Sequence, residues 1–455
     1  MTIKNLIGYI KHMSIIITIL QVALGMTIIV GLHELGHMLM AKLFGMRVEA
    51  FTLGFPPKIL KKKIGETEYG IGAMPFGGYV TISGMVDESA ALEESKEEKK
   101  PEPYEFRAKP AWQRILVILG GVIMNFLLGI FIYTFLTFSS GVSYLSKDEV
   151  NKYGITTTEI GRKLGFQDGD KILTLDGKDF EDFRDIFDAK KFIETGEATT
   201  LVVENQGEKR EVILNKENFF DFLLTQNKDQ IAQYLQCIVP RVPFEIKNVV
   251  NKKLPIVAGD KIVSIGGIET HFFNELQREL NKNRGKVVEM KFLHLGEEVV
   301  SQVEIDAAGK LGVEVDSLLK FSYKKFSFFE SIVLGSKRAY DIVKMNLLGI
   351  WGMITGKLSA KENLSGPIGI VKVFTQSHDW SFFWNIIAVI SLCLGLMNVL
   401  PIPALDGGHA FLILIECIIG HKIKEKYLIK IQQAGMALLL LLLLYCTYND
   451  VIHLF

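Results

Sequence analysis

Two histidines and a glutamate stand close together at the inner end of an apolar stretch, in the sequence His33-Glu34-Leu35-Gly36-His37. On a helix the two histidines are four positions apart and lie on one face. That spacing can hold a zinc ion, and Glu34 can then act as general base on a water that the metal activates. The alternative is a helix end whose polar side chains simply reach water, although ionisable groups at membrane depth are rarely tolerated without a function.

A carboxylate far along the chain could complete this site. The apolar segment that begins near Trp380 is interrupted at 398–409, NVLPIPALDGGH, where two prolines and paired glycines predict a break in the helix. Two histidines and one carboxylate, with one position left open for water, form a catalytic zinc set. Asp406, His409 and Glu416 are the alternative third ligands. We favour Asp406, because a helix break flanked by glycines leaves it free to reach across.

These residues must be positioned by membrane-spanning helices. Four apolar segments approach or exceed the length that crosses a bilayer: 14–44, 115–138, 380–405 and 431–448. Basic residues cluster between the first two segments and between the last two, so we expect both loops to be cytoplasmic and both termini outside. Lys plus Arg and Asp plus Glu number 51 each, which gives no indication of nucleic-acid binding. The four scattered cysteines form no CxxC pair.

The first cytoplasmic loop has two parts. Residues 48–84 are rich in glycine, aromatic and β-favouring residues, which predicts short strands and turns against the membrane surface. This region is either an ordinary surface hairpin or an edge strand that pairs with an extended substrate. Residues 87–102 are charge-dense and predict a solvated linker.

The long middle region contains an internal repeat. FQDGDKILTLDGK at 166–178 recurs as IVAGDKIVSIGGI at 256–268, each with a Gly-Asp turn, an alternating strand and a second glycine turn. We expect each copy to continue with an amphipathic helix and a strand pair, and so predict two β-rich domains. They look like bacterial PDZ domains, which implies binding of a peptide or chain terminus by strand addition. Alternatively, they only screen the membrane site. Beyond them, 328–357 predicts an interfacial amphipathic helix.

We therefore predict a multi-pass α-helical membrane protein of about four transmembrane helices, with a membrane-associated β-hairpin or sheet and two extracytoplasmic PDZ-like domains. The predicted parts are the first transmembrane helix with HELGH (1–47), the β region and charged linker (48–111), the second transmembrane helix (112–140), the two PDZ-like domains (141–234 and 235–320), the amphipathic helix and turn (321–379), the third transmembrane segment (380–420) and the fourth helix (421–455).

HELGH at 33–37 and NVLPIPALDGG at 398–408 resemble the two signatures of the site-2 protease family of intramembrane zinc metalloproteases. The tandem PDZ-like copies and the turn at 363–370 resemble its bacterial regulator-of-sigma-E protease subgroup, and the likeness covers nearly the whole chain. The resemblance implies a Zn²⁺ cofactor and a sheet edge near 71–80 that receives the unwound substrate. It also implies these roles: metal ligands His33, His37 and Asp406, general base Glu34, and substrate-backbone contact Asn398.

By this resemblance the protein would lie in the bacterial cytoplasmic (inner) membrane and hydrolyse peptide bonds in transmembrane segments. Its partners would be the lipid bilayer and single-span membrane proteins already trimmed outside, of the anti-sigma factor or remnant signal peptide type. The competing hypothesis is a non-catalytic scaffold that binds metal and clusters partners through its PDZ-like domains. Glu34 separates the two hypotheses, because a pure metal binder needs no base beside its ligands.

Overall fold

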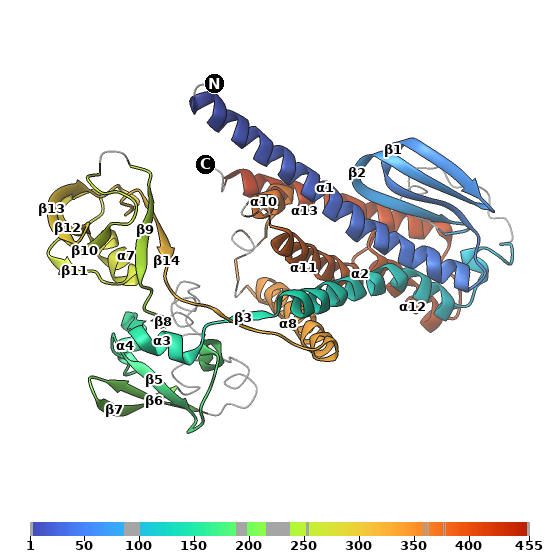
Figure 1. Ribbon diagram of the computed structural model, residues 1–455. Helices are drawn as coiled ribbons and strands as arrows, with labels where there is room; N and C mark the ends of the chain where they lie inside the picture. The colour runs from blue at the N-terminus through green and yellow to red at the C-terminus, as the bar shows by residue number, and fades with distance from the viewer. Residues whose placement is uncertain are drawn as a thin grey trace. The chain divides into compact units, whose positions relative to one another are not determined.

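The chain forms two compact units, which are described separately: one of Met1–Gly141 with Lys325–Phe455, and one of Val142–Lys324 (Figure 1). The structure is a computed structural model. It describes residues 3–85, 101–187, 198–214, 237–251, 254–356, 358–359, 361, 364–375, 377 and 379–452. The predicted charged linker lies almost entirely outside these residues.

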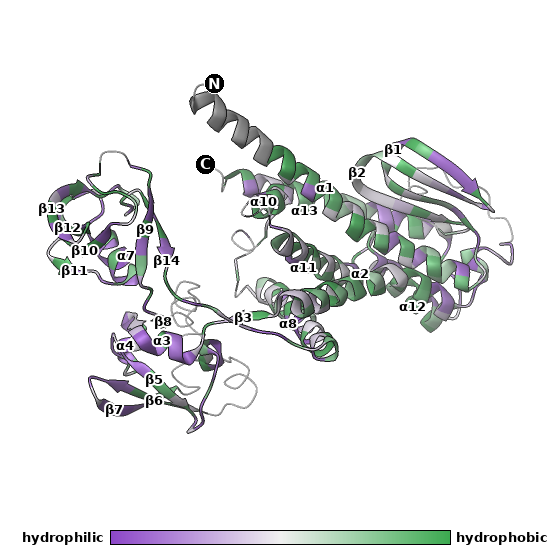
Figure 2. Cartoon of the chain, viewed as in Figure 1, coloured by the Kyte–Doolittle hydropathy of each residue, from purple (hydrophilic) through white to green (hydrophobic). Residues whose placement is uncertain are grey.

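The first unit is built of apolar helices. Among the described residues, four helices are long and apolar enough to cross a membrane, which confirms the four predicted spans: Ile15–Leu43, Ala111–Ser140, Trp380–Val399 and Lys426–Ile452. Figure 2 shows apolar residues along most of these helices. The helices of this unit are α1 (Ile3–Leu43), η2 (Phe106–Ala108), α2 (Ala111–Ser140), α8 (Phe328–Ile354), α10 (Pro367–Phe374), α11 (Trp380–Val399), α12 (Asp406–Ile419) and α13 (Glu425–Ile452).

Helix α2 packs against α1, α8, α11 and α12. Its contact with α1 is made through glycines. A Cβ on Gly36 would lie 2.2 Å from the carbonyl oxygen of Gly120, and a Cβ on Gly120 would lie 2.6 Å from that of Gly36. Membrane helices approach this closely only where both faces carry small residues. The glycine of the HELGH sequence therefore sets the distance between α1 and α2.

Helix α8 covers α2 from another side. It buries a row of small residues one turn apart, Ser331, Gly335 and Ala339, against α2. Its large apolar side chains, such as Phe329 and Val333, are exposed instead. A helix is present over most of the predicted range 328–357, and the small residues account for its close packing on α2.

The glycine-rich region after α1 is an antiparallel sheet of two long, bent strands, β1 (Val48–Ile64) and β2 (Thr67–Ile82). The segment 50–53 pairs with 68–71 on one side and with 78–81 on the other, and 58–64 pairs with 67–72. The sheet edges among the described residues are therefore 58–64 and 78–82. The predicted edge at 71–80 is wrong in its first residues, because β1 bends and returns to cover them.

The second unit has two hydrophobic cores, one within 150–238 and one within 244–311. The Gly-Asp turns of the repeat adopt the same geometry: Asp170 accepts a hydrogen bond from the Gln167 N–H at 2.8 Å, and Asp260 accepts one from the Val257 N–H at 2.9 Å. The elements are β3 (Val142–Tyr144), α3 (Lys147–Tyr153), β4 (Ile155–Thr157), α4 (Glu159–Lys163), β5 (Lys171–Leu175), η3 (Phe183–Phe187), β6 (Thr199–Asn205), β7 (Glu208–Leu214), β8 (Ile238–Pro240), β9 (Phe244–Val249), β10 (Lys261–Ile265), β11 (Ile268–Glu269), α7 (Phe273–Lys282), β12 (Val287–His294), β13 (Glu297–Glu304), β14 (Val313–Ser317) and β15 (Ser322–Lys324).

Each copy of the repeat contains a sheet of its own. The strands β5, β6 and β7 form one sheet, and β11, β10, β12 and β13 form the other. Helix α7 lies in the second copy, whereas 188–197 of the first copy is outside the described residues. Strand β8 pairs with β4, so Cys237 and Ile238 pack into the first core, although the second domain was predicted to begin at 235. A strand that pairs with a short strand of the preceding domain is not visible in local sequence.

We predict that Gly36→Ala destabilises the membrane unit, because the added methyl group meets backbone atoms that cannot move aside. Overpacking of this kind costs about 1–3 kcal/mol. The midpoint of thermal unfolding in detergent, measured with a chelator present, should fall. Gly349→Ala on α8 is the matched control, since nothing lies within 4 Å of the added Cβ. Equal midpoints for the two variants would contradict the close approach of α1 and α2.

Candidate metal centre

Helices α1 and α12 bring three side chains to one point. The Nε2 atoms of His33 and His37 lie 3.2 Å apart, and they lie 3.2 and 3.5 Å from Oδ2 of Asp406. All three ligand atoms lie within 4.8 Å of one another, and both histidines are buried. The Oδ2 atom is itself buried, and no donor other than the two histidine nitrogens lies against it among the described residues. Two nitrogens and a buried carboxylate oxygen that converge in this way fit a zinc ion.

The backbone and one side chain of α2 hold the two imidazoles from behind. Nδ1 of His37 lies 2.9 Å from the carbonyl oxygen of Val117, which can accept its proton and leave Nε2 as the ligand atom. Nδ1 of His33 lies 3.2 Å from Nδ2 of Asn125. Between them, a Cβ on Gly121 would stand 2.4 Å from Nε2 of His37, so only glycine leaves room for the imidazoles. Gly121 and Asn125 were not predicted as site residues. The sequence features that could have indicated them are a pair of glycines and a single amide within an apolar span.

Asp406 reaches the histidines because the chain breaks just before it. Helix α11 ends at Val399 and α12 begins at Asp406, as the prolines of this stretch predict. Gly407 and Gly408 follow at once, and a Cβ on either would lie within 2.3 Å of a carbonyl oxygen in the break. The paired glycines therefore allow α12 to start directly against the preceding turn, with the carboxylate at its first residue.

The two remaining predicted residues border the same cluster. Nδ2 of Asn398, in the last turn of α11, lies 3.4 Å from Nε2 of His33. Glu34 lies against the edge 78–82 of the sheet, where its carboxylate contacts the backbone of Val80 and its Cγ would lie 3.6 Å from a Cβ on Gly78. The structure thus brings all five predicted site residues together. It places a carboxylate that could serve as a base between the three possible ligands and a strand that is an edge of the sheet among the described residues.

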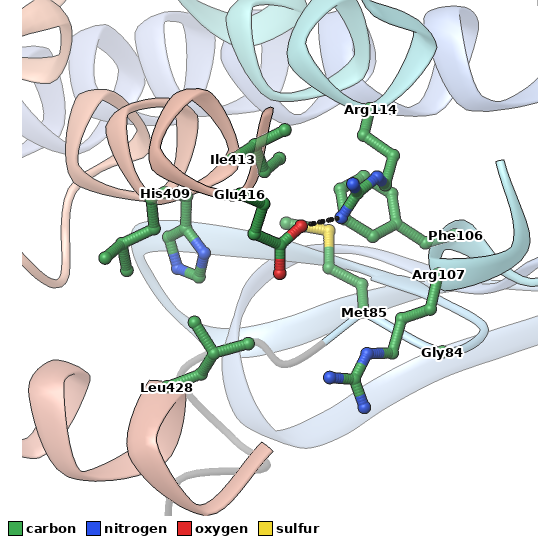
Figure 3. A pocket seen from close by; sticks show the side chains of 10 residues that line it. Gly84, Met85, Phe106, Arg107, Arg114, His409, Ile413, Glu416 and Leu428 are labelled. Atoms are coloured by element: carbon green, nitrogen blue, oxygen red, sulfur yellow. Dashed lines mark hydrogen bonds and ion pairs between the residues drawn. The ribbon is translucent and has the colours of Figure 1, made fainter. Parts of the chain in front are cut away.

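The alternative third ligands, His409 and Glu416, line a pocket and are not part of the histidine cluster. Figure 3 shows His409 and Glu416 among the residues that line a pocket. The volume of this pocket, about 40 Å³, holds no more than a few waters. Glu416 accepts a hydrogen bond from Arg114 at 2.8 Å, and His409 contacts Gln432. Burial and the neighbouring Arg114 guanidinium lower the pKa of the nearby Lys422 ammonium. Of the three alternatives, the structure brings only Asp406 to the histidines.

We predict that Asp406→Asn weakens zinc binding by more than about 100-fold, because loss of a ligand should exceed the cost of losing a residue that only supports one. Competition with a chromophoric chelator measures this affinity. Glu416→Gln and His409→Gln serve as matched controls on the same helix and should keep zinc. Full occupancy in Asp406→Asn, or loss of zinc in either control, would mean that the third ligand is wrongly assigned.

Comparison with known proteins agrees with this geometry. Residues 21–442 match peptidase family M50. A protein of Borreliella burgdorferi named "Putative zinc metalloprotease" is 29% identical over 441 residues, which cover 95% of this chain and 98% of the relative.

Two further relatives are named as regulator of sigma E proteases. The regulator of sigma E protease of Haemophilus influenzae is 28% identical over 95% of this chain and 98% of its own length. The regulator of sigma-E protease RseP of Escherichia coli is 29% identical over 94% of this chain and 96% of its own length. Because the family match spans nearly the whole chain, metal cluster and membrane helices included, the chain belongs to peptidase family M50, the zinc metallopeptidases that include the site-2 proteases.

Proposed function

We propose that the chain hydrolyses peptide bonds in the transmembrane segments of single-span membrane proteins, with zinc bound by His33, His37 and Asp406. One observation carries the proposal: the three ligand atoms lie within 4.8 Å of one another inside a bundle of apolar helices. The substrates are proteins already shortened outside the membrane, of the anti-sigma factor or remnant signal peptide type, so the reaction is a step of regulated intramembrane proteolysis.

Each residue of the site has a part in this reaction. Bound zinc supplies a Lewis acid that activates water and polarises the scissile carbonyl. Glu34 accepts the proton of the attacking water and passes it to the leaving amine. Asn398 offers an amide 3.4 Å from a ligand nitrogen, so it can hold the substrate backbone beside the reacting carbonyl.

A helical substrate must unwind before its carbonyls are accessible, and the sheet offers a partner for the unwound backbone. Val80 turns its backbone toward Glu34 and away from β1. Because backbone directions alternate along an antiparallel strand, Gly78 and Ile82 also face outward. A substrate strand paired here regains the hydrogen bonds that it loses on unwinding. Its scissile bond then lies beside Glu34.

The membrane arrangement follows from charge. Basic residues of the loops after α1 and α12 favour a cytoplasmic side for both loops, in the bacterial inner membrane. The unit Val142–Lys324 then lies outside. We propose that its two halves are PDZ-like domains that bind a peptide or chain terminus and exclude substrates that have not been trimmed. The matching Asp170 and Asp260 turns support a common fold for the two halves.

We predict that Glu34→Gln abolishes cleavage of a tagged single-span substrate by the purified protein but leaves zinc bound. Loss of a general base costs about 10²–10⁴-fold in rate. Zinc content, measured by atomic emission, is the control, because the amide keeps the size of the side chain and is not a ligand. Equal cleavage by both forms, or none by either despite bound zinc, would favour the metal-binding scaffold.

We predict that substrate contacts the edge 78–82 and not the edge 58–64. A photo-crosslinking phenylalanine analogue at Tyr79, in the Glu34→Gln background, should capture the substrate. The same analogue at Leu60, on the opposite edge, is the matched control and should not. Capture from Leu60 at the same yield would exclude strand addition at the edge beside Glu34.

A further inference from the structure

Asn125 is the one buried amide of α2 that touches the metal cluster. Its side chain is fully buried, and its Nδ2 lies 3.2 Å from Nδ1 of His33. Its backbone oxygen accepts a hydrogen bond from Oγ of Ser391 at 2.8 Å, which links α2 to α11 at this level. The Oδ1 atom, in contrast, is buried without a hydrogen-bond partner among the described residues. An unpaired buried acceptor destabilises a fold, so its presence needs a reason.

The chemistry of a histidine that binds a metal ion explains why this acceptor is unpaired. Nε2 of His33 is the atom that faces His37 and Asp406. A neutral imidazole carries one proton, and when Nε2 binds a metal ion the proton is on Nδ1. Nδ1–H then needs an acceptor, which the Nδ2 of an amide cannot be. A half-turn of the Asn125 amide brings Oδ1 to the place of Nδ2, because the two atoms are nearly equivalent in shape.

Without metal the other tautomer suits Asp406 and the Asn125 amide in its present orientation. Nε2–H of His33 can donate to Oδ2 of Asp406 across 3.2 Å, and Nδ1 can accept from Nδ2 of Asn125 across 3.2 Å. An amide carries both a donor and an acceptor, so one side chain serves both tautomers. His37 differs, because its Nδ1 faces the carbonyl of Val117, which can only accept.

We propose that Asn125 is a positioning residue of the metal centre, whose Oδ1 accepts the Nδ1–H of His33 when zinc is bound and whose amide turns over when zinc leaves. The inference rests on the ligand set proposed above. It makes the two histidines unequal: the carbonyl of Val117 holds His37 in one tautomer throughout, whereas His33 changes tautomer with the metal.

Two substitutions separate this role from simple packing. Asn125→Leu keeps the size of the side chain but removes the acceptor, and we expect zinc affinity to fall about 10–100-fold, as for other supports of metal ligands. Asn125→Asp keeps the acceptor and loses the donor, and its affinity should stay within about tenfold of the unmodified chain. When the same variants are titrated with cobalt, the visible absorption of bound cobalt should give the same order of metal affinity. Thr134→Val, also buried on α2, is the control and should change neither.

The proposal is overturned if Asn125→Asp loses zinc as severely as Asn125→Leu, or if Asn125→Leu binds it normally. If Asn125→Leu fails to fold, nitrogen NMR of histidine-labelled unmodified protein still decides, with the His33 signals identified by their absence from His33→Gln. Nδ1 of His33 should carry the proton with zinc bound and lose it to Nε2 when zinc is removed; the same tautomer in both states would refute the proposal. Normal zinc affinity in His33→Gln would instead overturn the ligand set itself.

Discussion

The metal centre depends on how closely α1 and α2 approach each other. At Gly36 and Gly120 the two backbones are in contact, with no space for even a methyl group on either side. Because the helices are this close, the imidazoles of His33, one turn before Gly36, and of His37, the next residue, lie directly against α2. The protein thus uses backbone contact, which is rigid, to set the positions of side chains that must be held within tenths of an ångström.

Helix α2 supports the site through positions four residues apart, on one face over two turns. The carbonyl of Val117 meets one histidine, Gly121 leaves room for both, and Asn125 meets the other. The Asp406 carboxylate reaches the cluster independently, from α12, because the chain breaks between Val399 and Asp406. The buried pair of Arg114 and Glu416 joins α12 to α2 below the site. Loss of one partner would leave the other buried and uncompensated, so this pair ties the two halves of the site together.

Much of this could be predicted from the sequence, because a polar residue in an apolar run is a strong signal. The spans, the break before Asp406 and the pairing of HELGH with a distant carboxylate all follow from that rule. What could not be predicted depends on contacts between distant residues. Strand β1 bends and covers the first part of the predicted edge, β8 pairs with β4 of the preceding copy, and Asn125 meets a histidine 92 positions away. None of these three contacts produces a periodic pattern in the local sequence.

The central claim is that one zinc ion is bound by two imidazoles and a carboxylate at the contact of α1, α2 and α12. X-ray absorption at the zinc edge of the purified protein tests it most directly. The account predicts two imidazole nitrogens at about 2.0–2.1 Å, with the remaining scatterers oxygen atoms at about 2.0–2.2 Å. Sulfur scattering at about 2.3 Å, which would bring in one of the four cysteines, or fewer than two imidazoles, would contradict it.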